Sequence, residues 1–271
     1  MSASLGGLIR DYRLQKNLSQ QEVAYALGWK EPSRLSRIEQ GHIEKPTRQL
    51  MDRIISILNL DRKERGNLLL AGNYVPTDDE INLIRKELYS TINDWDYPVT
   101  VYDFTDRIIM ENETCKKIYY ETNQQAENIE KNLPNIIELS FDDSYSQNEF
   151  TKQENSTKLE ESLLNILIQY KNKQKERSRE DFYIKMISKL VKNDLFRKLW
   201  QEINTLDPKT EEKKLTIANY VKDFLVVPAR QTDKTLLFNL FMVPAMNDPR
   251  FEVEFHNPAN LETYHFFEES K

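Results

Sequence analysis

The spacing of hydrophobic residues divides this chain into a helical first part and a mixed second part. Up to about residue 75, apolar residues recur three and four positions apart, which predicts short amphipathic helices. Beyond residue 97, helical stretches alternate with short runs rich in aromatic and β-branched residues, which are typical of strands. The pattern predicts a mixed fold, with an all-α domain of five helices over residues 1–75 followed by an α+β domain over residues 97–271.

The stretch from residue 18 to residue 41 has the most specific pattern. Ser19 stands three residues before Glu22, the spacing of a capping box at a helix start. Gly28 provides the positive φ that ends this helix and turns the chain, while Leu35 and Ile38 form the apolar side of the next helix. Further helices are predicted around Leu5, Leu8 and Ile9, around Leu50, Ile54, Ile57 and Leu58, and after the N-cap residue Asp61.

Two segments of this stretch resemble a known family. Residues 18–24 read Leu-Ser-Gln-Gln-Glu-Val-Ala, and residues 35–41 read Leu-Ser-Arg-Ile-Glu-Gln-Gly. At these residues the chain resembles the phage-repressor (Cro/repressor-like, XRE) helix-turn-helix family, over roughly residues 4–71. The resemblance implies that one helix enters a DNA groove, and that Arg13 and Glu39 form an internal salt bridge.

The same resemblance implies which residues contact DNA. Gln20 is expected to bind a phosphate, and Ser33, Arg34 and Arg37 are expected to face base edges. The predicted DNA contacts are Gln20, Ser33, Arg34, Arg37 and Lys45. The chain has about one residue more between Gly28 and Leu35 than the commonest family pattern. A purely structural helical bundle with a solvated basic face is the alternative interpretation.

The charge distribution favours the DNA-binding interpretation. Residues 1–75 hold 12 Lys and Arg against 8 Asp and Glu, a net charge of +4, whereas the whole chain carries −6, so the remainder carries −10. A local positive charge attracts the phosphate backbone, and an acidic remainder is repelled by it. We therefore expect the chain to have two functions, DNA binding in its basic first part and a second function in its acidic remainder.

Length and composition indicate a globular protein of two domains. The 271 residues with 39% hydrophobic content suffice for packed cores. The sequence shows neither an apolar run of about 18 residues nor a secretory signal, so we expect a cytoplasmic, nucleoid-associated protein without membrane insertion. One cysteine excludes an intramolecular disulfide framework.

A linker helix and a β-hairpin are predicted to begin the second part. Thr77 and Glu80 have capping-box spacing, and the residues up to Trp95 continue at helical spacing, which predicts a linker helix over 76–96. Strands are predicted at 99–104 and 107–110, and later at 224–227, 236–243 and 251–255. In the last strand, Phe251, Val253 and Phe255 alternate with Glu252, Glu254 and His256, which predicts one buried face and one wet face.

The landmarks of this part resemble a second family. The motifs are Trp95-x-x-Pro98, then Val-Tyr-Asp, a hairpin and Glu111-Asn112, followed by apolar segments at 133–141 and 196–200. Their order is similar to that of the motifs of the MmyB-like ligand-binding domain. The resemblance implies a PAS-like fold and an apolar, fatty-acid-like ligand. The residues expected to line its pocket are Tyr102, Phe104, Phe238, Leu240, Phe241 and Met242.

The segments between these strands are less regular. Residues 142–158 are polar and aperiodic, which predicts a long exposed loop. A helix is predicted over 159–170, and residues 182–200 resume the helical period with an unusually apolar face. The additional apolar residues on this face are compatible with a ligand cavity, a dimer interface or an ordinary hydrophobic core.

The residue pattern favours a regulator over an enzyme. His42, His256 and His265 lack metal-ligand spacing, and neither a phosphate-binding glycine loop nor a nucleophile elbow is recognisable. We expect Cys115 to pack in the core, and neither a metal nor a cofactor other than a bound apolar molecule.

The sequence thus predicts a dimeric, sequence-specific transcription regulator that binds an operator in double-stranded DNA and senses an apolar ligand. The alternatives are a peptide-sensing regulator with a helical-repeat second domain, and an antitoxin-like module that binds a partner protein.

Overall fold

The computed structural model describes residues 4–120, 122–141, 156–214, 224–228 and 235–269. The chain divides into two compact units. The first comprises residues 1–77 together with 244–252, and the second comprises residues 78–243 and 253–271. The predicted exposed loop at 142–158 lies largely outside the described residues. None of the described helices combines the length and apolarity needed to cross a membrane.

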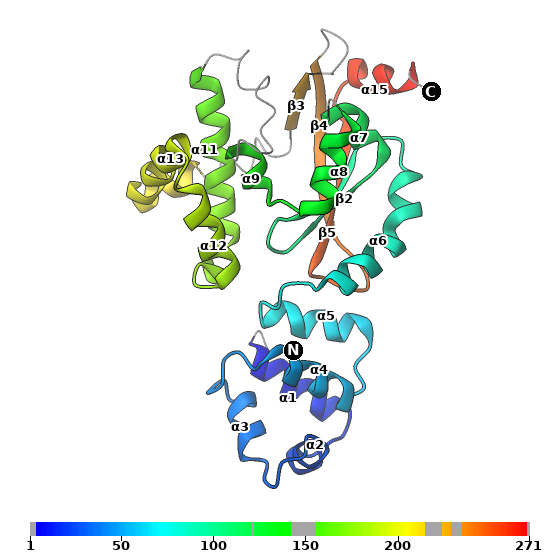
Figure 1. The fold of residues 1–271 in the computed structure, drawn as a ribbon, viewed down its shortest axis with the longest axis vertical. Helices are drawn as coiled ribbons and strands as arrows, with labels where there is room; N and C mark the ends of the chain where they lie inside the picture. Colours follow the sequence, from blue (N-terminus) through cyan, green and yellow to red (C-terminus); the bar gives the residue numbers. More distant parts are fainter. Residues whose placement is uncertain (1–3, 121, 142–155, 215–223, 229–234, 270–271) are drawn as a thin grey trace. The chain divides into compact units, whose positions relative to one another are not determined.

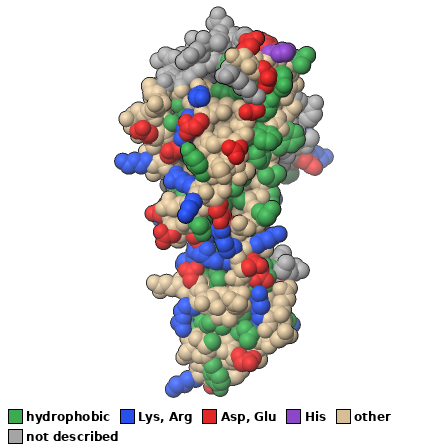
Figure 2. Space-filling model, turned by 90° about the vertical axis from the view of Figure 1, so that its right-hand side faces the viewer, with side chains coloured by type: hydrophobic (Ala, Val, Ile, Leu, Met, Phe, Trp, Pro, Cys, Tyr) green, Lys and Arg blue, Asp and Glu red, His purple; other side chains and the backbone are tan. Residues whose placement is uncertain are grey.

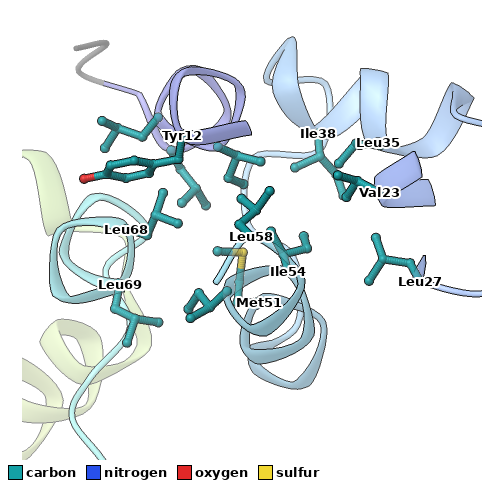
Figure 3. Close-up of a cluster of buried hydrophobic side chains, with 14 of the residues drawn as sticks. Tyr12, Val23, Leu27, Leu35, Ile38, Met51, Ile54, Leu58, Leu68 and Leu69 are labelled. Carbon is teal, nitrogen blue, oxygen red and sulfur yellow. The ribbon is translucent and has the colours of Figure 1, made fainter. Parts of the chain in front are cut away.

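The first unit is built from short helices, labelled α1 to α5 in Figure 1. Their bounds are α1 Leu5–Gln15, α2 Gln20–Ala26, α3 Ser33–Glu39, α4 Arg48–Ile57 and α5 Arg62–Ala71. Side chains from all five helices share one core, in which Leu35 and Ile38 of α3 point toward Val23 of α2 (Figure 3). Met51 of α4 is fully buried in this core, and Tyr12 of α1 lies beside Leu68 of α5 (Figure 3).

The ends of these helices have the predicted capping residues and the predicted turn glycine. Ser19 and Glu22 form the predicted capping box at the start of α2, and Asp61 and Glu64 form another at the start of α5. Gly28 has a φ of 80° in the turn after α2, as its position predicts. Gly6 lets α1 approach α3, because a Cβ there would overlap the carbonyl oxygen of Ile38.

A distant segment, residues 244–252, completes the first unit. Within it, Arg250 is fully buried, and its guanidinium donates to Asp248 Oδ2 at 2.6 Å and to the carbonyl oxygen of Tyr74 at 3.4 Å. Gly66 of α5 fits against the same segment, since a Cβ there would lie 2.7 Å from Pro249 Cδ. The helix-rich unit therefore includes residues far from it in sequence, which hydrophobic spacing does not predict.

The second unit combines a sheet with helices (Figure 1). Its strands are β1 Val99–Asp103, β2 Ile108–Glu111, β3 Phe224–Pro228, β4 Thr235–Pro244 and β5 Phe251–Pro258, in the spatial order β2-β1-β5-β4-β3. The pairs β1–β2 and β3–β4 are antiparallel. The predicted strands are thus present, each within a residue or two of its expected bounds at the start.

The helices of this unit fall into two groups. The first comprises α6 Asp78–Asn93, α7 Glu113–Tyr119, α8 Asn123–Asn132 and α15 Leu261–Glu268, of which α6 and α8 contact β2 and α7 contacts β1. The second comprises α9 Ile136–Phe141, α11 Ser156–Lys173, the short 3-10 helix η1 Lys175–Arg177, α12 Asp181–Leu190 and α13 Asp194–Thr205. Figure 1 shows α11, α12 and α13 gathered beside α9, around a separate hydrophobic core.

The helical period predicted over 182–200 is present and is divided between two helices, α12 and α13, because Asn193 caps a new helix by accepting from the Phe196 backbone N–H. The prediction that one face of β5 is exposed to solvent is wrong, since Glu254 and His256 are buried. The strand lies inside the sheet between β1 and β4, and neighbouring tyrosines supply hydrogen-bond partners to both polar side chains.

Candidate functional site

Helix α3 exposes three of the predicted DNA-contacting residues. Leu35 and Ile38 are fully buried against the core, which fixes which side of the helix faces outward. Ser33, Arg34 and Arg37 are exposed on the remaining surface. The sequence therefore brings a hydroxyl and two guanidiniums together on one helix face, where they are free to meet base edges and phosphates.

A buried ion pair holds α3 against α1, as the family resemblance implies. Arg13 Nε lies 2.6 Å from Glu39 Oε1, and Arg13 Nη2 lies 2.9 Å from Glu39 Oε2. Their side chains are only 8% and 1% exposed. The carboxylate hydrogen bond raises the pKa of Arg13, so the guanidinium stays charged. This bidentate geometry fixes the direction of α3 as well as its distance from α1.

The other predicted DNA contacts make internal interactions in the DNA-free chain. The Gln20 amide donates to Glu39 Oε2 at 2.8 Å, so it joins the buried pair. Lys45 is exposed, but its ammonium donates to the carbonyl oxygen of Asn73 at 3.2 Å and lies 5.5 Å from the centre of the Tyr74 ring. Contacts of Gln20 and Lys45 with phosphates therefore stay predictions.

The extra residue between α2 and α3 lies in a loop that also positions Arg34. The Trp29 backbone N–H donates to the Ala24 carbonyl at 2.9 Å, which closes the turn after α2. The Arg34 guanidinium carbon lies 4.8 Å from the centre of the Trp29 ring. This cation–π contact orients Arg34 from the side of the loop. Arg37, the other exposed arginine of α3, has no such contact with an aromatic ring among the described residues.

Charges on the surface are mixed rather than segregated. Figure 2 shows one face of the molecule, on which Lys and Arg side chains are interspersed with Asp and Glu side chains. The net charge of +4 over residues 1–75 therefore does not produce one continuous basic field on this face.

Comparison with known proteins supports the interpretation of the first unit. Residues 4–68 match the model of a family described as a helix-turn-helix domain. This match indicates a DNA-binding regulator and covers α1 to α4 and most of α5. No curated protein matches the chain.

The six residues expected to line a ligand pocket lie in four separate places of the second unit. Phe238 and Leu240 pack with Ile118 of α7 and Phe267 of α15, whereas Tyr102 and Met242 belong to a cluster with α8. Phe104 packs edge to face on Phe182, with ring centres 5.9 Å apart. Phe241 is 54% exposed, on the opposite face of β4 from Phe238. The structure does not bring these six side chains together.

The second unit instead contains a buried polar network that hydrophobic spacing did not reveal. Tyr119 Oη lies 2.6 Å from His256 Nδ1, and His256 Nε2 lies 3.1 Å from Glu254 Oε1. The Tyr102 hydroxyl donates to the same Glu254 oxygen at 3.4 Å. The only sequence signal for this network is the polar pair Glu254 and His256 on an interior strand.

A second buried carboxyl lies close by on β2. The Tyr120 hydroxyl donates to Glu111 Oε2 at 2.6 Å. Burial raises the pKa of Glu111 to about 7, against the opposing effect of the Tyr120 hydrogen bond. Burial likewise raises the pKa of the Cys115 thiol well above its usual value. Cys115 is fully buried and is therefore core rather than a reactive thiolate, as the sequence predicts.

A pocket of about 250 Å³ lies between the helical group and the β1–β2 turn. Tyr170 of α11, Phe182, Lys185 and Met186 of α12, and Arg107 after the turn are among its lining residues. The predicted ligand residues are not among them. The apolar surplus of residues 182–200 was the sequence signal for this site, since α12 presents Phe182 and Met186 one turn apart.

Proposed function

We propose that this chain is a sequence-specific transcription regulator that binds its operator as a dimer through α3. The observation that carries the proposal is the exposed face of Ser33, Arg34 and Arg37 on a helix whose direction is fixed by the Arg13–Glu39 pair. The helix-turn-helix match over residues 4–68 supports it. A single recognition helix covers about half of a usual operator, so two-fold related half-sites and a homodimer follow.

The second unit, in this proposal, is a PAS-like sensor of an apolar, fatty-acid-like ligand whose binding changes operator occupancy. The support is the five-stranded sheet in the order β2-β1-β5-β4-β3, with helices between β2 and β3, together with the resemblance of its sequence landmarks. The sheet argues against the helical-repeat alternative. An antitoxin-like module that binds a partner protein remains the second candidate.

Arg37 and Gln20 provide the test of the DNA-binding part. On a duplex selected from a random library, Arg37→Ala is expected to weaken binding by about 1–3 kcal/mol and to relax base preference. Gln20→Ala is expected to weaken selected and random duplexes about equally, because a phosphate contact carries no base information. Fluorescence anisotropy at one salt concentration measures both effects.

Lys63→Ala is the matched control, since it removes a positive charge from an exposed position on α5 of the same unit. It should leave discrimination between the duplexes unchanged. Unchanged discrimination in both Arg34→Ala and Arg37→Ala would exclude α3 from base recognition.

A further inference from the structure

The pocket between α9, α11, α12 and the β1–β2 turn has one buried donor that the protein does not use. Tyr170 is 3% exposed, and its hydroxyl has no hydrogen-bond partner among the described residues. Its ring stacks on Tyr183, with ring centres 5.9 Å apart and planes 8° from parallel, so the hydroxyl cannot swing away easily. Buried hydroxyls in native proteins are almost always hydrogen-bonded, so an acceptor is expected to complete this one.

The charged groups of the pocket leave one cation uncompensated. Arg107 Nη2 lies 2.7 Å from Asp103 Oδ2, and Lys189 Nζ lies 2.8 Å from Glu138 Oε1. Lys185, in contrast, forms no ion pair with a residue that the structure describes. The excess of positive charge is notable because residues beyond 75 carry a net charge of −10. The pocket is therefore suited to a single negative charge.

The other lining residues and the volume of the pocket indicate the polarity and size of the part of the ligand that lies beside its charged group. Phe182 and Met186 project from the same face of α12 as Lys185, since positions i, i+3 and i+4 are neighbours on a helix. Met186 is 9% exposed, and Phe182 is held by its edge-to-face contact with Phe104. At about 250 Å³, the space is smaller than the roughly 300–1,000 Å³ of pockets for drug-sized ligands.

We propose that this pocket binds a small monocarboxylate with a compact apolar body, aromatic or branched, rather than a long alkyl chain. Lys185 pairs with the carboxylate, the Tyr170 hydroxyl donates to one of its oxygens, and Phe182 and Met186 contact its apolar part. Burial raises the pKa of Tyr170, so its hydroxyl remains a neutral donor. The effect of such a ligand on DNA rests on the proposed regulator function, whereas its binding does not.

The test uses the full chain and three pairs of probes: phenylacetate, 3-phenylpropionate and 4-methylpentanoate, each with its neutral amide. Ligand-observed NMR titrations give the dissociation constants. We expect at least two of the three acids to bind about fivefold more tightly than their amides, because the amide cannot pair with Lys185. Equal binding of acids and amides, or absence of binding by all six probes up to millimolar concentrations, would overturn the proposal.

Variants assign the binding to this pocket. Lys185→Gln should abolish the preference for acid over amide, and Lys192→Gln, an exposed lysine just beyond the same helix, should not. Tyr170→Phe should weaken acid and amide alike by about fivefold, since both accept a hydrogen bond. Tyr183→Phe is its control, because it removes a hydroxyl from the other ring of the stack. Probe affinities that neither Lys185→Gln nor Tyr170→Phe changes would show that the probes bind elsewhere, and would contradict the proposal.

Two further measurements separate this proposal from the proposed function. Acids that bind as described but never change operator affinity would leave the pocket standing and remove its regulatory role. Decanoate that binds more tightly than the compact acids and is weakened by Lys185→Gln would contradict the size limit proposed for this pocket. Tight decanoate binding that Lys185→Gln leaves unchanged would instead favour a separate site for the fatty-acid-like ligand of the proposed function.

Discussion

Arg13→Ala and Glu39→Ala are each expected to destabilise the helix-turn-helix unit by about 3–5 kcal/mol. Removing either partner leaves the other charge buried. Among the described residues, the Leu18 carbonyl still accepts from Arg13, or the Gln20 amide still donates to Glu39. Hydrogen exchange of peptides from α1 and α3, followed by mass spectrometry in the full chain, measures the free energy of opening of this unit. Arg13→Met combined with Glu39→Leu should cost much less than the sum of the two single changes.

Lys16→Ala provides the control for this prediction. Lys16 pairs with Glu64 at 3.1 Å in the same unit, but the side chains are 33% and 21% exposed. An ion pair exposed to that degree is expected to contribute less than about 1 kcal/mol. Small and additive losses for Arg13→Ala and Glu39→Ala, similar to that of Lys16→Ala, would show that the buried pair does not hold α3 in place.

The second large effect is a pH dependence of stability caused by Glu111. The unfolded carboxyl loses its proton near pH 4.5, whereas the folded carboxyl, with a pKa of about 7, keeps it longer. Between these values the folded state binds more protons, so the free energy of unfolding falls as pH rises and is lowest above pH 7. At about 1.4 kcal/mol per pH unit, the loss amounts to about 3 kcal/mol.

Glu111→Gln should remove this loss while still accepting the hydrogen bond of Tyr120. Urea unfolding is expected to show the variant more stable than the unmodified chain at pH 8, by up to about 3 kcal/mol, and similar to it at pH 4.5. Glu127→Gln, an exposed position on α8, should change neither value. A ¹³C NMR titration of the Glu111 carboxyl with a midpoint near 4.5 would contradict this prediction.

The helix-turn-helix unit was largely predictable because its signals are local. Capping residues such as Ser19 and Asp61 act on backbone N–H groups within one turn, and Gly28 acts on its own φ. The Arg13–Glu39 pair spans 26 residues, and it came from the family resemblance rather than from spacing. Local rules therefore located the elements, and the resemblance supplied the long-range contact.

The second unit was less predictable because its important contacts join distant segments. The alternation of residues along β5 predicted that Glu254 is exposed to solvent. Glu254 is instead hydrogen-bonded by the hydroxyl of Tyr102, which is 152 residues away in sequence. Arg250 contacts Tyr74 across 176 residues, so nothing in its immediate sequence assigns it to the first unit. The pocket combines Tyr170 with α12 and the β1–β2 turn in the same way, and only the apolar surplus of α12 indicated it.

The proposed function requires that α3 of a paired helix-turn-helix reads a DNA sequence. Repeated selection of duplexes from a random library by the full chain tests it most directly, with Arg37→Ala selected in parallel. We predict an enriched, two-fold symmetric sequence with half-sites about one helical turn apart, and loss of preference at one or more base positions in each half-site for the variant. A library that stays random after selection, or an enriched sequence that Arg37→Ala and Arg34→Ala both leave unchanged, would contradict the claim.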